Sequence, residues 1–71
     1  MNDANLIRMA HQIADFYAPY TEAEAIEGVA VHIRKFWDPS MRDRLIALSQ
    51  TPDAGLSPTL TAAITRLIAL S

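Results

Sequence analysis

The chain of 71 residues has no cysteine and only two glycines. Without cysteine, disulfides, thiolate zinc sites and iron–sulfur clusters held by this chain are excluded. The two histidines, His11 and His32, cannot complete a structural zinc site alone, and we expect both to be partly buried polar residues. Because a chain this short builds only a marginal core, we expect a partner to add stability. The alternative is a well-packed helical miniprotein that stands alone.

Positive charge is also scarce, with six Lys and Arg against eight Asp and Glu and a net charge of −2. Such an acidic domain is a poor candidate for autonomous nucleic-acid binding. No apolar run approaches the ~20 residues of a membrane span, so we expect no membrane contact. The N-terminus carries Asn2 and Asp3 where a signal peptide would be basic. We therefore expect a cytoplasmic protein.

The sequence contains four amphipathic segments, and 51% of its residues are hydrophobic. The first begins after Asn2 or Asp3 and ends near Ala18, because Pro19 disfavours helix before it. The second runs from the Thr21 region to Phe36 or Trp37, the third follows Pro39, and the fourth follows Pro58. The pattern predicts one small all-α domain over residues 1–71, a bundle of about four short helices with up-and-down connectivity.

Helix starts are well marked. Thr21-Glu22-Ala23-Glu24 has the form of a capping box. Asp38-Pro39 and Ser57-Pro58 each place a capping residue before a proline that fits the first helical position.

Each glycine has a structural interpretation. Gly28, in mid-helix, costs roughly 1 kcal/mol relative to Ala, which favours a close crossing where a side chain would not fit. Gly55 can supply a positive φ in the turn over residues 51–55.

The sequence contains no convincing catalytic constellation. Ser40 lies near Asp38 and within sequence reach of His32, but a serine after Asp-Pro at a helix start is ordinary capping chemistry. Neither metal-ligand spacing nor a glycine-rich phosphate loop is present. We expect no catalytic, cofactor-binding or metal-binding residue, and a chain that is not an enzyme by itself. A small acyl-carrier protein with Ser40 as attachment site is an alternative, although Pro39 separates the serine from Asp38 and the surrounding residues are basic.

Aromatic and basic residues gather between residues 32 and 44, which include the single tryptophan. Large aromatics beside arginine are typical of binding surfaces. We expect Trp37 to lie at a corner with one ring face open, and the fourth helix, whose one charged residue is Arg66, to lie against something other than its own domain. The predicted partner interface consists of Tyr20, Arg34, Lys35, Phe36, Trp37 and Arg42. The same charges also allow a simpler interpretation, in which an acidic and a basic solvated face attract each other weakly.

Three segments resemble a known family. They are Leu6–Phe16, the block His-Ile-Arg-Lys-Phe-Trp-Asp-Pro-Ser-Met-Arg from His32 to Arg42, and Gly55-Leu56-Ser57-Pro58. Together they resemble the delta subunit (FdsD) of soluble NAD-dependent formate dehydrogenases. The central block is the most specific, whereas residues 49–54 are generic.

The resemblance implies a non-catalytic accessory subunit of a cytoplasmic complex that interconverts formate and CO2. In that family, the alpha subunit would hold molybdenum or tungsten with a bis-guanine-dinucleotide pterin and most iron–sulfur clusters. The beta subunit would bind FMN and NAD, and gamma would hold a further cluster. This chain would bind none of them, dock on alpha and support assembly or stability of the holoenzyme. A dissociable maturation factor is the alternative within the same family.

Overall fold

The computed structural model describes residues 2–70, which form four α-helices and no strand. These are α1 (Asp3–Phe16), α2 (Glu22–Phe36), α3 (Pro39–Ser49) and α4 (Pro58–Leu70). The predicted all-α class with four short helices is therefore confirmed. None of the helices within these residues is long and apolar enough to cross a membrane.

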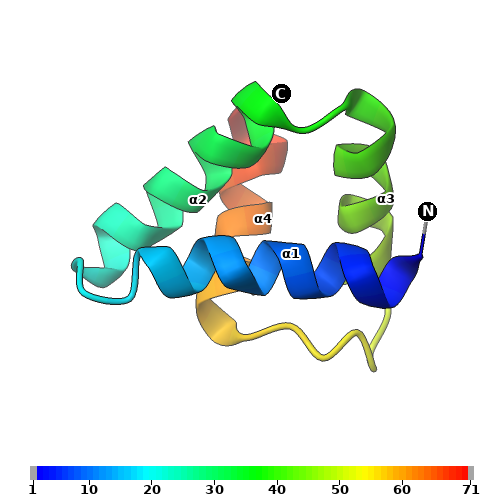
Figure 1. The fold of residues 1–71 in the computed structure, drawn as a ribbon, viewed down its shortest axis with the longest axis horizontal. Helices are drawn as coiled ribbons and strands as arrows, with labels where there is room; N and C mark the ends of the chain where they lie inside the picture. Colours follow the sequence, from blue (N-terminus) through cyan, green and yellow to red (C-terminus); the bar gives the residue numbers. More distant parts are fainter. Residues whose placement is uncertain (1, 71) are drawn as a thin grey trace.

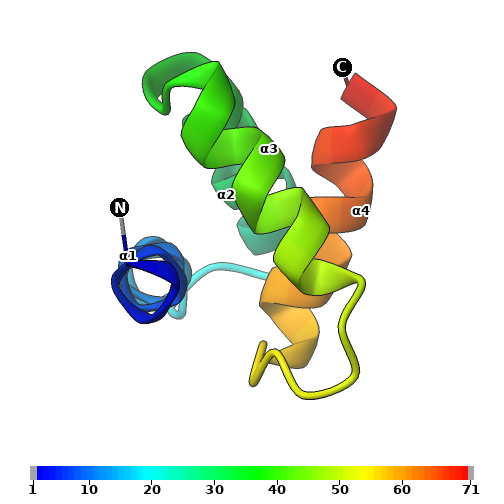
Figure 2. The same cartoon turned by 90° about the vertical axis from the view of Figure 1, so that its right-hand side faces the viewer.

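The helices are not all antiparallel neighbours. In Figure 1, α2 rises, α3 descends and α4 rises again, as up-and-down connectivity requires, whereas α1 lies across the other three. Figure 2 looks along α1 and shows α4 on the far side of α2 and α3 from it. The most extensive packing joins α2 to α4, two helices that do not follow each other in the chain.

The core lies between α2 and α4 and is closed by α1 and α3. It consists of small and branched side chains and one tryptophan: Leu6, Ala10, Val29, Ala30, Ile33, Trp37, Leu45, Leu60, Ala63, Ile64 and Leu67. The α4 residues among them are at most 2% exposed. The expectation that α4 lies against something outside the domain was therefore wrong for its apolar stripe. This stripe of α4 packs against the other three helices of the same domain.

Helix starts follow the predicted capping chemistry with one exception. The Asn2 side chain accepts the backbone N–H of Ala4 at 2.8 Å, and Thr21 with Glu24 forms the complete capping box. Asp38 precedes Pro39 as predicted but makes no capping hydrogen bond through its side chain. The Pro39 ring, with its fixed φ, is thus the feature that starts α3.

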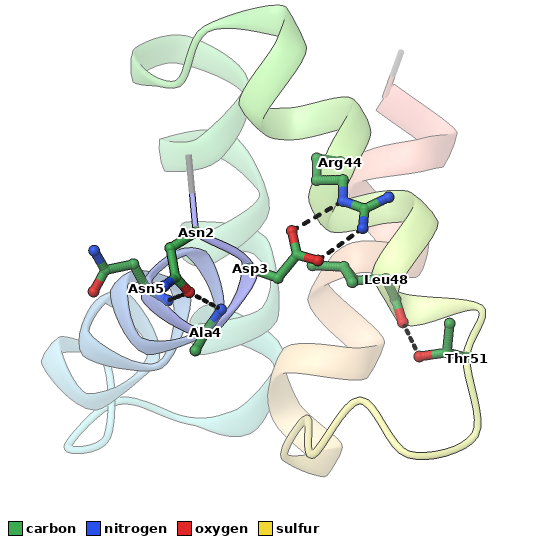
Figure 3. A network of polar contacts seen from close by, with 7 residues as sticks. All are labelled: Asn2, Asp3, Ala4, Asn5, Arg44, Leu48 and Thr51. Atoms are coloured by element: carbon green, nitrogen blue, oxygen red, sulfur yellow. Dashed lines mark hydrogen bonds and ion pairs between the residues drawn. The ribbon is translucent and has the colours of Figure 1, made fainter.

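Two ion pairs between helices fix the arrangement. Arg44 of α3 donates to both carboxylate oxygens of Asp3 in α1, at 3.0 and 2.7 Å (Figure 3). Chiefly through these hydrogen bonds, Arg44 holds the pKa of Asp3 below its ordinary value. Arg66 of α4 donates to Glu27 of α2 at 2.7 Å. Both pairs are largely exposed, so we expect them to orient the helices more than to stabilise them.

Candidate partner interface

The junction of α1 and α2 is built on the contact between Gly28 and the Tyr17 ring. A β-carbon at Gly28 would lie 2.5 Å from Cε1 of Tyr17 and 2.6 Å from Cζ. The predicted close approach at Gly28 is thus confirmed, and the group that needs the space is an aromatic ring. This contact places the aromatic end of α1 directly on the exposed side of α2.

From this contact, aromatic rings extend in two directions. Tyr17 packs edge to face on Phe16, with ring centroids 5.1 Å apart, and Tyr20 lies 5.4 Å from Tyr17. Along α2, positions 28, 32 and 36 share one side because they are four residues apart. The His32 and Phe36 rings lie 5.0 Å apart on that side. We call this surface the aromatic face, made of Phe16, Tyr17, Tyr20, His32 and Phe36.

Three rings of the aromatic face are open to solvent. Phe36 is 73% exposed, Phe16 69% and Tyr20 50%. A single exposed apolar side chain is ordinary, but several large ones that gather on one side of a small domain mark an interaction surface. The buried core is continuous without these rings, so folding of the domain does not account for their presence.

The predicted exposure of Trp37 was wrong. Trp37 is 8% exposed and belongs to the core cluster with Ile33 and Leu45. Successive residues of a helix point about 100° apart, so the Phe36 and Trp37 side chains leave the chain in different directions. The chain turns at Asp38, which leaves the Trp37 ring over the core and the Phe36 ring outside. In this fold the Trp37 ring therefore packs in the core.

The basic residues of the predicted interface do not lie together on one side of the domain. Arg34 and Phe36 are two positions apart and point to nearly opposite sides of α2, with Arg34 on the side of the Glu27–Arg66 pair. Lys35 is exposed and lies three residues from His32, one turn along α2. Within residues 2–70, neither Arg34 nor Lys35 forms an ion pair. Arg42 is partly buried, with Asp43 4.0 Å away.

A hollow of about 490 Å³ adjoins the other end of the aromatic face. It lies where the end of α1 meets the beginnings of α2 and α4, and Tyr17 and Tyr20 form part of its wall. Asp15 and Glu22 add two carboxylates to its lining. The aromatic face therefore has an acidic end at this hollow and a basic end at Lys35.

His11, Ser40 and the acidic side chains are the groups of this chain that could take part in catalysis or bind a metal. His11 is engaged at both ring nitrogens, since Nε2 accepts the Ser57 N–H at 3.2 Å and Nδ1 donates to the Ile7 carbonyl at 3.1 Å. Ser40 is exposed and its side chain has no hydrogen bond to a base in the described part of the chain. Over the same residues, no group of three or more His, Asp or Glu side chains gathers as metal ligands.

Three members of the aromatic face were missed by the sequence interpretation. Phe16, Tyr17 and His32 were left out of the predicted interface, which concentrated on the continuous string around Trp37. The four-residue spacing of Gly28, His32 and Phe36, offset from the buried stripe of α2, is the signal that could have found this side. The place of Phe16 in this face could not be predicted from the sequence, because it depends on the ring contact with Tyr17.

Comparison with known proteins supplies the family. The family model of the NADH-dependent formate dehydrogenase delta subunit, FdsD, matches residues 5–64, which include all of α2 and α3 and most of α1. The comparison with curated proteins gave no match, and the comparison with solved structures gave none either. The match spans most of the chain, and the chain therefore belongs to the family of delta subunits of NADH-dependent formate dehydrogenase.

Proposed function

We propose that the chain is a non-catalytic accessory subunit that docks on the catalytic alpha subunit through the aromatic face and supports assembly or stability of the holoenzyme. The observation that carries the proposal is the exposure of Phe16 and Phe36 on one side of a domain whose core is complete without them. Membership of the delta-subunit family implies other subunits to which such a surface can bind.

The size of the domain is consistent with a stable interface. A standard interface covers roughly 600–1,000 Å² on each partner. The chain exposes 4416 Å² in total, so such an interface would cover about a fifth of its surface. Buried aromatic anchors supply most of the binding energy in interfaces of this kind, and Phe16, Tyr20 and Phe36 are the exposed rings that can act so.

The cofactors expected for the complex would be held by the other subunits. In this proposal, molybdenum or tungsten with its pterin, the iron–sulfur clusters, FMN and NAD are bound elsewhere in the complex. The chain has no cysteine, and within residues 2–70 no three His, Asp or Glu side chains gather as metal ligands. In this proposal the delta subunit acts on the reaction only by holding the catalytic subunit in its assembled form. We favour a permanent subunit over a dissociable maturation factor, because a marginal core benefits from lasting burial.

The proposal is tested by co-purification of the complex with a tagged delta chain. Phe16→Ala with Phe36→Ala should reduce the delta chain recovered with the alpha subunit by tenfold or more, as loss of interface anchors does. Ile68→Ala is the matched control, because Ile68 is 45% exposed on α4 and has no ring contact with the aromatic face. Full recovery of the double variant would contradict docking through this face.

Stoichiometry separates the remaining alternatives. Equal amounts of delta and alpha chains in the active, purified enzyme support a permanent subunit. A delta chain bound only to enzyme that lacks its cofactors identifies a maturation factor. An added mass equal to phosphopantetheine on Ser40 would identify the chain as an acyl-carrier protein instead.

A further inference from the structure

The hollow at the acidic end of the aromatic face has the chemistry of a receptor for a positive side chain. The acidic residues before residue 32 number five, and three are engaged within the chain: Asp3 with Arg44, Glu24 with Thr21, and Glu27 with Arg66. The other two, Asp15 and Glu22, both line the hollow. Within residues 2–70, no ion pair or side-chain hydrogen bond engages either carboxylate, and the described lining includes no Lys or Arg.

The position of Asp15 is not explained by the stability of its own helix. It lies in the last turn of α1, where the helix end is already negative and a carboxylate is unfavourable. Glu22, in contrast, lies in the first turn of α2, where negative charge is favourable. The starts of α2 and α4 near the hollow each contribute about half a positive charge, so the two full carboxylate charges dominate the field there.

The walls of the hollow add a second kind of attraction for a cation. Tyr17 and Tyr20 line it with their rings 5.4 Å apart, and Tyr17 is held in place by its contact with Gly28. Aromatic rings attract ammonium and guanidinium groups through their faces. Carboxylates and rings in the lining of one hollow thus suit a long side chain with an apolar stem and a charged head.

We infer that, when the aromatic face docks, a lysine or arginine side chain of the partner protein enters this hollow, pairs with Asp15 and Glu22 and packs on Tyr17 and Tyr20. The inference rests on the docking function proposed above and specifies the chemistry of the partner. The partner surface carries a basic residue beside an apolar area that covers Phe16. The acidic hollow fixes the orientation of the docked domain, because the opposite end of the aromatic face is basic.

The decisive variant is Asp15→Asn in the full chain, measured by recovery of the delta chain with the other subunits. The change keeps the size of the side chain and removes an unfavourable charge from the end of α1, so thermal unfolding should show equal or higher stability. Recovery with the complex should nevertheless fall by about tenfold at low salt. Asp53→Asn removes another exposed carboxylate, from outside the hollow, and should leave recovery unchanged.

Two further measurements identify the occupant. Raising the salt concentration should lower recovery of the wild-type chain toward that of Asp15→Asn, because the lost interaction is between charges. Tyr20→Leu, which keeps an apolar side chain but removes the ring, should weaken binding at every salt concentration.

The possible failures are distinguishable. If the Phe16 and Phe36 variants lose the complex but Asp15→Asn does not, the docking function stands and the cationic occupant is wrong. If none of these variants affects recovery, the docking proposal itself fails. If the isolated chain forms a dimer that Asp15→Asn abolishes, the cation comes from a second copy and the inference of a different partner protein is overturned.

Discussion

The Tyr17 ring lies on the backbone of α2 at Gly28, so close that a β-carbon at this glycine would lie 2.5 Å from the ring. Five residues separate α1 from α2, and this contact sets how closely the two helices approach each other. It also connects the two parts of the aromatic face, since Phe16 and Tyr20 pack on Tyr17 while His32 lies one turn beyond Gly28.

Gly28→Ala is expected to lower stability, although alanine is the better helix former. The gain in helix propensity is about 1 kcal/mol. Displacing the Tyr17 ring costs about 1–3 kcal/mol, which offsets that gain and leaves a net loss of up to about 2 kcal/mol. In a Tyr17→Ala background the clash is absent, and Gly28→Ala should then stabilise the chain. Urea unfolding of wild type, the two single variants and the double variant measures this change of sign. If Gly28→Ala has the same effect with and without the Tyr17 ring, the ring moves aside freely.

Trp37 and Phe36 are adjacent in sequence and should respond oppositely to truncation. Trp37→Ala removes a core side chain that is 8% exposed and should cost about 3–5 kcal/mol of unfolding free energy. Phe36→Ala removes a ring that is 73% exposed and should change the stability of the isolated chain by less than about 1 kcal/mol. Thermal unfolding of both variants, compared with their recovery in the complex, separates folding from docking. Equal destabilisation by the two would contradict this division.

Most of the fold could be predicted from the sequence because its signals are local. The capping box at Thr21, the prolines at 39 and 58 and the positive φ of 73° at Gly55 each depend on a few neighbouring residues. The crossing of α1 over the other helices could not be predicted in this way, because it involves contacts between residues far apart in sequence, such as Asp3 with Arg44, 41 positions away.

The site was harder to predict because residues that are adjacent in sequence point to different sides of a helix. The string from Arg34 to Trp37 has the composition of an interface, yet its members point to different sides of α2 and one of them is core. The structure places the Tyr17 ring, on which Phe16 packs, against Gly28 of α2, one turn from His32, and no local pattern contains that connection.

The capping residues Thr21 and Asp38 provide a matched test of hydrogen bonding at helix starts. Thr21 accepts the backbone N–H of Glu24 at 3.2 Å, so Thr21→Ala should cost about 1 kcal/mol of stability. Asp38 makes no capping bond, and Asp38→Ala should cost only a few tenths of a kcal/mol. Denaturant midpoints measure both changes. Similar losses for the two would mean that Asp38 caps α3 in solution.

The Asp3–Arg44 pair predicts a specific acid sensitivity. Because hydrogen bonds from Arg44 hold the pKa of Asp3 below its ordinary value, the folded chain binds a proton at Asp3 less readily than the unfolded chain. The stability from this pair is therefore complete above about pH 4 and is lost as the pH falls through the lowered pKa. Asp3→Asn should show a lower melting temperature than wild type at neutral pH, and the difference should shrink in acid. A constant difference would show that charge is not involved.

The two histidines of the chain make different contacts and should respond differently to the same substitution. His11 joins α1 to the start of α4, because its Nε2 atom accepts the N–H of Ser57 while Nδ1 donates to the Ile7 carbonyl. His11→Leu would leave the partly buried Ser57 N–H without its acceptor, at a cost of about 1–3 kcal/mol. His32→Leu loses only a ring contact with exposed Phe36 and should change stability by less than about 1 kcal/mol.

Amide hydrogen exchange makes the His11 prediction specific to one bond. The Ser57 N–H should exchange faster in His11→Leu, beyond the acceleration expected from the loss of global stability, because the bond that protects it is removed. In His32→Leu its exchange should match that of wild type. If Ser57 exchanges equally in all three proteins, the link between α1 and α4 is made by packing of Leu6 and Leu60 in the core, and His11 is a wall residue of the hollow without a structural bond.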